Sequence, residues 1–243
     1  MRRRFSYRRL TITWLMFAAL LSTFVLAETP ERSVSAADGL TVSDKEIGPV
    51  TEVADLQIIC VLKHDPAGDK YIDAMRDLNS KLGGLISSLR DRGEFEGDAG
   101  ETLLLTPPAN SIAAHQLLLI GVGSEANVSL ESLAITGRIA AREAIRLRAA
   151  SVGFAPALRD QGSQRIDVAA GDAAFTEQFL LALDTQTRLA AQKLADPPTV
   201  KTLTIEAGSK FFDGAAEKVT AAIDAADTAI NKRDNSPYIH SDK

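Results

Sequence analysis

Cysteine and histidine are scarce in this chain of 243 residues, and their scarcity argues against two kinds of site. Cys60 is the only cysteine, so no disulfide can form within the chain. Its neighbours in residues 56–62 are mostly apolar, which favours a small buried side chain over a reactive thiol. The three histidines, His64, His115 and His240, have neither the spacing of zinc ligands nor a cysteine cluster beside them, so we expect no protein zinc site.

Basic runs are also missing after the first nine residues. The formal net charge is −5, and positions 2, 3, 4, 8 and 9 hold five of the arginines, so the remainder is more acidic still. A net-acidic body offers no electrostatic attraction for nucleic acid. It should also be repelled by anionic membranes, so we expect neither as a partner once the N-terminal segment is removed. The G-x-S-x-G motif of many serine hydrolases is absent as well.

What the chain has at its start, in residues 1–27, is a basic segment followed by an apolar one. The apolar run extends from Leu10 to Leu26 and closes with the small residue Ala27. This is the layout of a secretory signal peptide, which predicts cleavage at this point and export to the periplasm or out of the cell. An uncleaved membrane anchor stays open, because the run is near the lower length limit for spanning a bilayer. Arg8-Arg9 also allows a twin-arginine signal, although the residues that follow fit that pattern poorly.

The rest of the chain alternates strand-like and helix-like segments. Residues 28–50 are polar with little periodicity, which predicts a disordered lead-in. Residues 55–62 form an apolar run with the length of a strand buried on both faces. Further strands are expected at residues 101–105, 116–120, 151–155 and 202–206, and helices at residues 72–89, 129–147, 173–194 and 212–233. This alternation predicts an α/β fold with a largely parallel sheet that has helices on both faces.

The first expected helix carries an irregularity. Gly83-Gly84 interrupts its apolar stripe, and a glycine costs about 1 kcal/mol in a helix. Lys81, Arg90 and Asp91 lie off the stripe.

The last expected helix has an alanine-rich stripe with spacings of 4-3-4-3-4, which is typical of a two-helix seam. We therefore expect the domain at residues 51–208 to be followed by a helical arm at residues 209–235 and a tail at residues 236–243. The arm should pack against something outside the domain. Its candidate interaction residues are Phe212, Val219, Ile223 and Ile230.

Gly121-Val122-Gly123 follows an expected strand and precedes a helix, where free backbone amides can hold an anion. Gly121 and Gly123 are therefore weak candidates for cofactor binding. The pattern is not G-x-G-x-x-G, because Ala126 occupies the third glycine position. A tight turn that needs positive φ explains the two glycines better.

Two groups of acidic residues have the chemistry for catalysis or metal binding. Asp65, Asp69 and Asp73 lie near one strand end, and carboxylates are ligands that Mg²⁺ and Mn²⁺ prefer, but solvated loop acids explain them better. Residues 94–96 place two glutamates on one side of an extended segment. We expect a structural link there, with Phe95 packed on the core.

Four motifs in residues 82–123 then point to a known family. They are Ile86-Ser87-Ser88-Leu89, Gly93-Glu94-Phe95-Glu96-Gly97, Gly100-Glu101-Thr102-Leu103-Leu104-Leu105 and Leu117-Leu118-Leu119-Ile120-Gly121-Val122-Gly123. Their order and spacing resemble the N-terminal domain of the leucyl aminopeptidases, the cytosol aminopeptidase family, and the resemblance covers roughly residues 55–235. It implies a macro-like three-layer fold, with a mixed and mostly parallel sheet between helices. It also implies a role in assembly rather than in peptide cleavage.

The resemblance does not extend to the family's catalytic half. That half holds two divalent metal ions, Mn or Zn, and an N-T-D-A-E-G-R motif that does not occur in this sequence. We therefore expect no catalytic residue, metal ligand or cofactor in this chain. The leading hypothesis is an exported, non-catalytic protein that binds itself, a separate catalytic partner or another envelope protein. The alternatives are metallo-aminopeptidase activity, alone or as a subunit, and binding of a small nucleotide-like ligand in a macro-like cleft.

Overall fold

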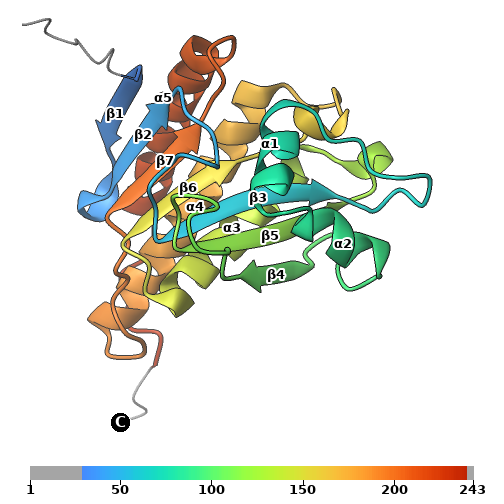
Figure 1. Cartoon of the computed structure of the whole chain (residues 1–243). Coiled ribbons are helices and arrows are strands. Elements are labelled where there is room, and N and C mark those ends of the chain that lie inside the picture. The colour runs from blue at the N-terminus through green and yellow to red at the C-terminus, as the bar shows by residue number, and fades with distance from the viewer. Residues whose placement is uncertain (1–28, 240–243) are drawn as a thin grey trace, which may run out of the picture.

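The computed structural model describes residues 29–239, which contain one seven-stranded sheet (Figure 1). The expected signal peptide at residues 1–27 lies outside the described residues. The strand order is β1-β2-β7-β6-β3-β5-β4, and the five inner strands run parallel while β1 and β4 are antiparallel edges. The strands are β1 (Glu31–Ser35), β2 (Thr41–Lys45), β3 (Leu56–Leu62), β4 (Thr102–Leu105), β5 (Gln116–Gly123), β6 (Ser151–Ala155) and β7 (Thr202–Glu206). The mixed, mostly parallel sheet predicted from the sequence is confirmed.

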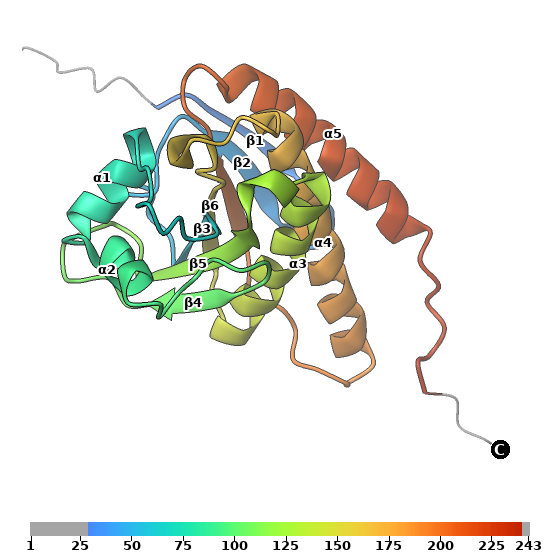
Figure 2. The ribbon, with the colours of Figure 1, turned by 90° about the vertical axis from the view of Figure 1, so that its right-hand side faces the viewer.

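Helices cover both faces of the sheet, as Figure 2 shows. One face carries α1 (Asp73–Lys81) and α2 (Leu85–Asp91), and the other carries α3 (Leu130–Leu147), α4 (Val168–Ala191) and α5 (Phe212–Asn231). Alternate residues of β3 serve the two cores, because side chains along a strand point to opposite faces. Ile59 packs in the α1–α2 core, whereas Ile58 and Cys60 pack in the core under α3, α4 and α5. Cys60 is fully buried, as predicted, and its burial raises the pKa of the thiol.

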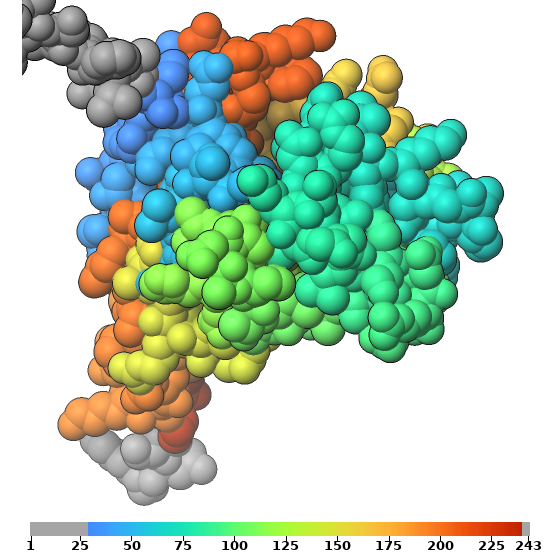
Figure 3. All heavy atoms as spheres, in the orientation of Figure 1, coloured from blue at the N-terminus to red at the C-terminus, as the bar shows by residue number. Residues whose placement is uncertain are grey.

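The expectation of a disordered lead-in at residues 28–50 is wrong for the part described, which begins at residue 29. This segment supplies β1 and β2, and Val42 of β2 is buried in the core while it pairs with Leu203 of β7. The polar composition that suggested disorder has two sources. β1 is an edge strand with mostly exposed side chains, whereas β2 is an inner strand that buries the polar residues Ser43 and Asp44. Residues 48–51 then lie beside α1 on the face shown in Figure 3. The domain therefore starts well before residue 51.

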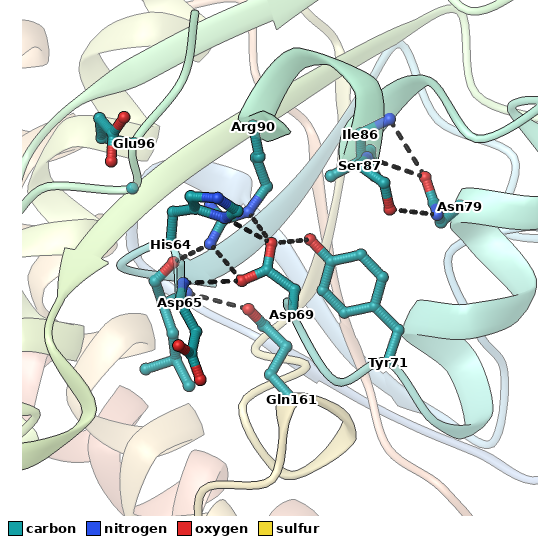
Figure 4. A network of polar contacts seen from close by, with 12 residues as sticks. His64, Asp65, Asp69, Tyr71, Asn79, Ile86, Ser87, Arg90, Glu96 and Gln161 are labelled. Atoms are coloured by element: carbon teal, nitrogen blue, oxygen red, sulfur yellow. Dashed lines mark hydrogen bonds and ion pairs between the residues drawn. The ribbon is translucent and has the colours of Figure 1, made fainter. Parts of the chain in front are cut away.

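The helix expected at residues 72–89 is divided into α1 and α2. Gly83 and Gly84 have φ angles of +68° and +80°, a left-handed conformation that costs glycine little. The side chain of Asn79 bridges the break (Figure 4): its Oδ1 accepts hydrogen bonds from the amides of Ile86 at 3.1 Å and Ser87 at 3.3 Å. These bonds satisfy amides at the start of α2 that have no partner within the helix.

The C-terminal helix is present as α5, but it does not form an arm that reaches outside the domain. It lies along α4, and Phe212, Val219 and Ile223 are at most 9% exposed. Val219 and Ile223 belong to the main core, and Ile230 is half-buried. The seam pattern therefore indicated a helix–helix contact correctly, but the partner helix belongs to the same chain.

No helix among residues 29–239 combines the length and the apolar character needed to cross a membrane.

Candidate functional site

The carboxyl edge of the parallel strands is the natural place to look for a site. The chain leaves β3 toward α1 on one face of the sheet and leaves the neighbouring strand β6 toward α4 on the other. In open α/β sheets, ligands bind where connections diverge in this way.

The gap between the ends of β3 and β6 is closed by the side chain of Gln161. The β3–β6 ladder ends at the pair Ile59 and Ala155. Beyond it, Gln161 Oε1 accepts a hydrogen bond from the Leu62 amide at 2.9 Å, and Nε2 donates to the Cys60 carbonyl at 2.9 Å. The amide side chain thus takes the place of a neighbouring strand, and it forms part of the wall of a cavity of about 260 Å³ that Leu62, Asp69 and Tyr71 also line.

A polar network lies next to this closure (Figure 4). Arg90 of α2 donates to both carboxylate oxygens of Asp69, and its Nη2 also donates to the Leu62 carbonyl at 2.8 Å. Tyr71 Oη donates to the same carboxylate at 3.2 Å, and Nδ1 of His64 lies 3.1 Å from it. The network ties the loop after β3 to α2.

The charge of Asp69 is stabilised by these contacts. Burial alone would raise its pKa, but the hydrogen bonds from Arg90, the Asp65 amide and His64 lower the pKa to about 2. Burial raises the pKa of the Tyr71 phenol. Arg90 lies off the apolar stripe of the expected helix, yet it is only 1% exposed, because the loop that carries Asp69 covers it. No local pattern in the sequence indicates that contact.

The three loop acids considered as metal ligands do not converge. Asp69 is held by Arg90, Asp65 Oδ1 accepts from the Ala67 amide at 2.9 Å within its own turn, and Asp73 is exposed at the start of α1. Within residues 29–239, no group of three or more His, Cys, Asp or Glu side chains is placed to hold a metal ion. His115 lies 3.4 Å from Asp55 on the surface, and His240 is outside the described residues.

Gly121 and Gly123 lie within β5 rather than in an open turn. Their amides donate to the carbonyls of Glu101 at 2.8 Å and Gly97 at 3.0 Å. A Cβ atom at Gly121 would lie 2.1 Å from the Asp98 carbonyl oxygen, so the glycine is needed for the close approach of residues 97–100. These amides are therefore already paired within the chain, which favours the structural explanation of both glycines.

The link at residues 93–101 also satisfies its own amides. The Glu101 carboxylate accepts hydrogen bonds from the amides of Gly97 at 2.7 Å and Asp98 at 3.1 Å. Phe95 is 1% exposed in the α1–α2 core, as predicted. The expected structural link is confirmed in this respect.

A cavity of about 270 Å³ remains at the carboxyl ends of β6 and β7, one strand away from Gln161. Ala155 and Pro156 form one side, and Glu206 and Ala207 form the other. The first turns of α4, the loop after β2 and Phe211 complete the walls. No local pattern in the sequence marks this site, because its lining comes from six separate segments.

Glu206 is the most unusual group in the cavity wall. Its Oε1 accepts a hydrogen bond from Gln57 Nε2 at 2.6 Å, whereas Oε2 has no partner among the described residues. Burial raises the pKa of this carboxyl to about 8. Residue 153, on the neighbouring strand β6, must be a glycine, because a Cβ atom there would lie 2.6 Å from the Gln57 side-chain oxygen.

The family model for the N-terminal domain of the cytosol aminopeptidase family matches residues 59–193. The chain belongs to this family. A probable cytosol aminopeptidase of Thermosynechococcus vestitus is 33% identical over 135 residues, which cover 54% of this chain and 26% of that protein. The chain thus spans about a quarter of the length of this relative.

Solved structures confirm the macro-like fold. A mutant of tomato leucine aminopeptidase has a TM-score of 0.59 at 20% identity, covering 82% of this chain and 38% of that one. A macrodomain of Oceanobacillus iheyensis, solved with ADP, has a TM-score of 0.55 at 13% identity, covering 82% of this chain and all of that one. Both likenesses concern the fold alone.

Proposed function

We propose that this chain is an exported, non-catalytic member of the cytosol aminopeptidase family that acts by protein contact, with a second copy of itself as the partner to test first. The observation that carries this proposal is the match of residues 59–193 to the N-terminal domain of the family. Two acids in or beside the acidic groups that have the chemistry for catalysis or metal binding support the proposal, because they bond to other groups of the domain. Asp69 pairs with Arg90, and Glu101 accepts hydrogen bonds from the amides of residues 97 and 98.

The contact surface we favour lies at the end of α4, where hydrogen bonds attach the chain that follows α5. Asp184 accepts hydrogen bonds from both Arg188 and Arg233. Arg188 also donates to the Asn235 side chain at 2.6 Å, and the Tyr238 amide donates to Gln192 at 2.8 Å. These bonds hold residues 233–238 against the helix.

Exposed apolar side chains gather at this fastened end. Leu194 is 43% exposed, Tyr238 50% and Ile239 66%. Apolar side chains held in place by polar bonds can bury area on a partner with little further loss of entropy. They replace the α5 stripe as the candidate interface.

Light scattering on the purified protein tests this proposal. We expect a mass of at least twice that of the processed chain, which starts at Glu28 and is smaller than the 26.0 kDa of all 243 residues. The substitution Leu194→Asp should shift the assembly toward the monomer, whereas Ile72→Asp, an exposed apolar position before α1, should not. A protein that is monomeric throughout the concentration range, or an assembly indifferent to Leu194→Asp, would argue against self-association.

A second candidate function is aminopeptidase activity, alone or as a subunit. It is favoured by the relatives that match this chain, which are named as aminopeptidases. Hydrolysis of leucine amide substrates in the presence of Mn²⁺ or Zn²⁺ tests it. Turnover that a chelator abolishes, and that copurifies with the chain, would overturn the non-catalytic proposal.

A further inference from the structure

The cavity at the carboxyl ends of β6 and β7 lies where the chain leaves the sheet toward opposite faces. The loop after β2 passes to the face of α1, where Val50 packs against the α1–α2 core. The chain after the neighbouring strand β7 turns the other way into α5, whose Val219 lies in the core of the opposite face. Both connections line the cavity. Ligands of open α/β sheets bind at the carboxyl edge where connections diverge, so this is a position for a ligand.

The walls of this cavity are mainly apolar. They include Pro49, Leu133, Leu158, Ile166 and Phe211, which come from segments far apart in the sequence. Leu133 and Leu158 belong to the main core and Ile166 packs against it, so packing holds this part of the wall in place. A volume of about 270 Å³ is close to the lower limit for small-molecule sites, which suits a ligand with one ring or two fused rings.

Two of the acids in the lining carry little uncompensated charge. Glu206 Oε1 accepts a hydrogen bond from Gln57 Nε2 at 2.6 Å, and a pKa of about 8 keeps this carboxyl mainly protonated at neutral pH. Asp167 forms an ion pair with Lys218 at 2.7 Å. Neither carboxyl group therefore attracts a cation strongly.

The other charged residues of the lining are Arg159, Asp160 and Asp73. Burial and the charge of Asp73 raise the pKa of Asp160, whereas the charge of its neighbour Arg159 lowers it, so Arg159 and Asp160 offset one another. Asp73 is exposed at the start of α1, where water weakens its field. A charged ligand would therefore lose hydration on entering the cavity without gaining a matched partner.

We propose that this cavity binds a small uncharged organic molecule with one ring or two fused rings, held by contact with the apolar walls. Such a ring leaves water for apolar surroundings, which is favourable without any charged partner. A nucleoside diphosphate carries charges that these walls do not pair. The proposal does not depend on the protein-contact function, because the exposed apolar residues of the contact surface, Leu194, Tyr238 and Ile239, do not line the cavity.

Indole is the probe that tests the proposal, because its fluorescence emission moves to shorter wavelength in apolar surroundings. Trp14 is the only tryptophan of the chain, so the Trp14→Phe variant has no indole emission of its own. We expect a saturable shift of the emission, with a dissociation constant in the micromolar to millimolar range. A shift that does not saturate, or no shift at millimolar indole, would overturn the proposal.

Competition between small probes tests the selection against charge. Benzyl alcohol should displace indole, whereas benzylamine and benzoate, which are of similar size, should do so about fivefold less well, because each must bring a charge out of water. ADP should not compete in the same concentration range. If benzylamine, benzoate or ADP competes as well as benzyl alcohol, the site recognises charge and the proposal is wrong.

A substitution that fills the cavity locates the binding. Gly171 on α4 is a buried residue of the lining, and a Cβ atom there would lie 3.5 Å from Ile166 and 3.6 Å from Leu133, which are ordinary contacts. Gly171→Leu should occupy part of the space and weaken indole binding about tenfold. Gly214→Leu makes the same change on α5, where the Cβ position is open and outside the lining, and should leave the affinity unchanged.

If Gly171→Leu proves unfolded by circular dichroism, Gly171→Ala and Phe211→Ala take its place. The first adds a single methyl group to the wall, and the second removes a half-buried ring from it, so each should weaken indole binding severalfold. Affinity that is unchanged in both variants would place indole elsewhere and refute the site. Leu194→Asp should not alter indole affinity, so the failure of one proposal can be told from the failure of the other.

Discussion

Arg90 on α2 and Asp69 in the loop after β3 form a two-bonded ion pair in which the arginine side chain is 1% exposed and the aspartate 12%. The pair joins two segments that pack on the same face of the sheet. Removing one partner of such a pair leaves the other charge buried without compensation.

Asp69→Asn should therefore lower the free energy of unfolding by about 3 kcal/mol, measured by urea denaturation. Asp91→Asn, an exposed position on the same helix as Arg90, should change it by less than about 0.5 kcal/mol. Equal effects of the two substitutions would show that the buried pair has no special role.

The same pair predicts that the free energy of unfolding depends on pH below about pH 4. The pKa of Asp69 is about 2 in the folded protein, below its ordinary value of 3.8. A lowered folded pKa contributes stability that is present above pH 4 and is lost as the pH falls toward 2. The loss of stability between pH 4 and pH 2 should be smaller in Asp69→Asn than in the parent protein. Identical slopes in that range would contradict the assignment.

Asp44 on β2 should have the opposite effect on the pH dependence of stability, because its pKa is raised in the folded protein. Burial raises its pKa from 3.8 to about 7, against the opposing effect of Arg32, and the buried Asp172 carboxyl also lies near it. The folded protein keeps a proton that the unfolded chain releases, so the contribution of Asp44 to stability falls as the pH rises from 4 to 7. Asp44→Asn should remove this decline, on the order of a few kcal/mol, whereas Asp91→Asn at an exposed position on α2 should not. Parallel stability curves for Asp44→Asn and the parent protein would refute it.

Two helical glycines should respond in opposite ways to alanine. A Cβ atom at Gly137 on α3 would lie 2.3 Å from the Phe175 carbonyl oxygen of α4, so Gly137→Ala must push the helices apart and should lower the melting temperature by several degrees. Gly214 on α5 has open space around it, and Gly214→Ala should stabilise the protein by about 0.5–1 kcal/mol through helix propensity. A stabilising Gly137→Ala would show that α3 and α4 are not in such close contact.

The N-terminal segment gives a prediction that the described residues do not test. When the whole chain is expressed in a bacterial host and the periplasmic fraction is recovered, N-terminal sequencing should start at Glu28. A protein that stays in the membrane fraction with Met1 intact would favour the anchor instead.

The fold could be predicted from the sequence where burial leaves a clear pattern. The continuous apolar run of β3 predicted a strand buried on both faces, and the apolar stripe of α3 predicted a helix with one buried face. β1 and β2 could not be found in this way. The polar residues of β1 are exposed because it is an edge strand, and β2 buries the polar residues Ser43 and Asp44, so neither strand shows an apolar pattern.

The polar site could not be predicted, because it depends on contacts between distant segments. Arg90 lies off the apolar stripe of its helix, as surface residues do. It is buried because the loop that carries Asp69, 21 residues earlier, covers it. The Gln161 side chain forms hydrogen bonds with the backbone of Cys60 and Leu62, about 100 residues away in the sequence, and no local pattern marks such a partner. The α5 stripe shows the same limit: its spacing indicated a helical neighbour, but not which one.

The closure by Gln161 makes the shape of the sheet edge a property of one side chain. Backbone pairing between strands is shared by many residues and resists single substitutions, whereas this amide group can be shortened or removed by one codon change. Alanine or serine at this position would lose both hydrogen bonds and would widen the space between the ends of the third and sixth strands without any change in chain path. The width of the crevice at this edge is therefore set by the length of one side chain.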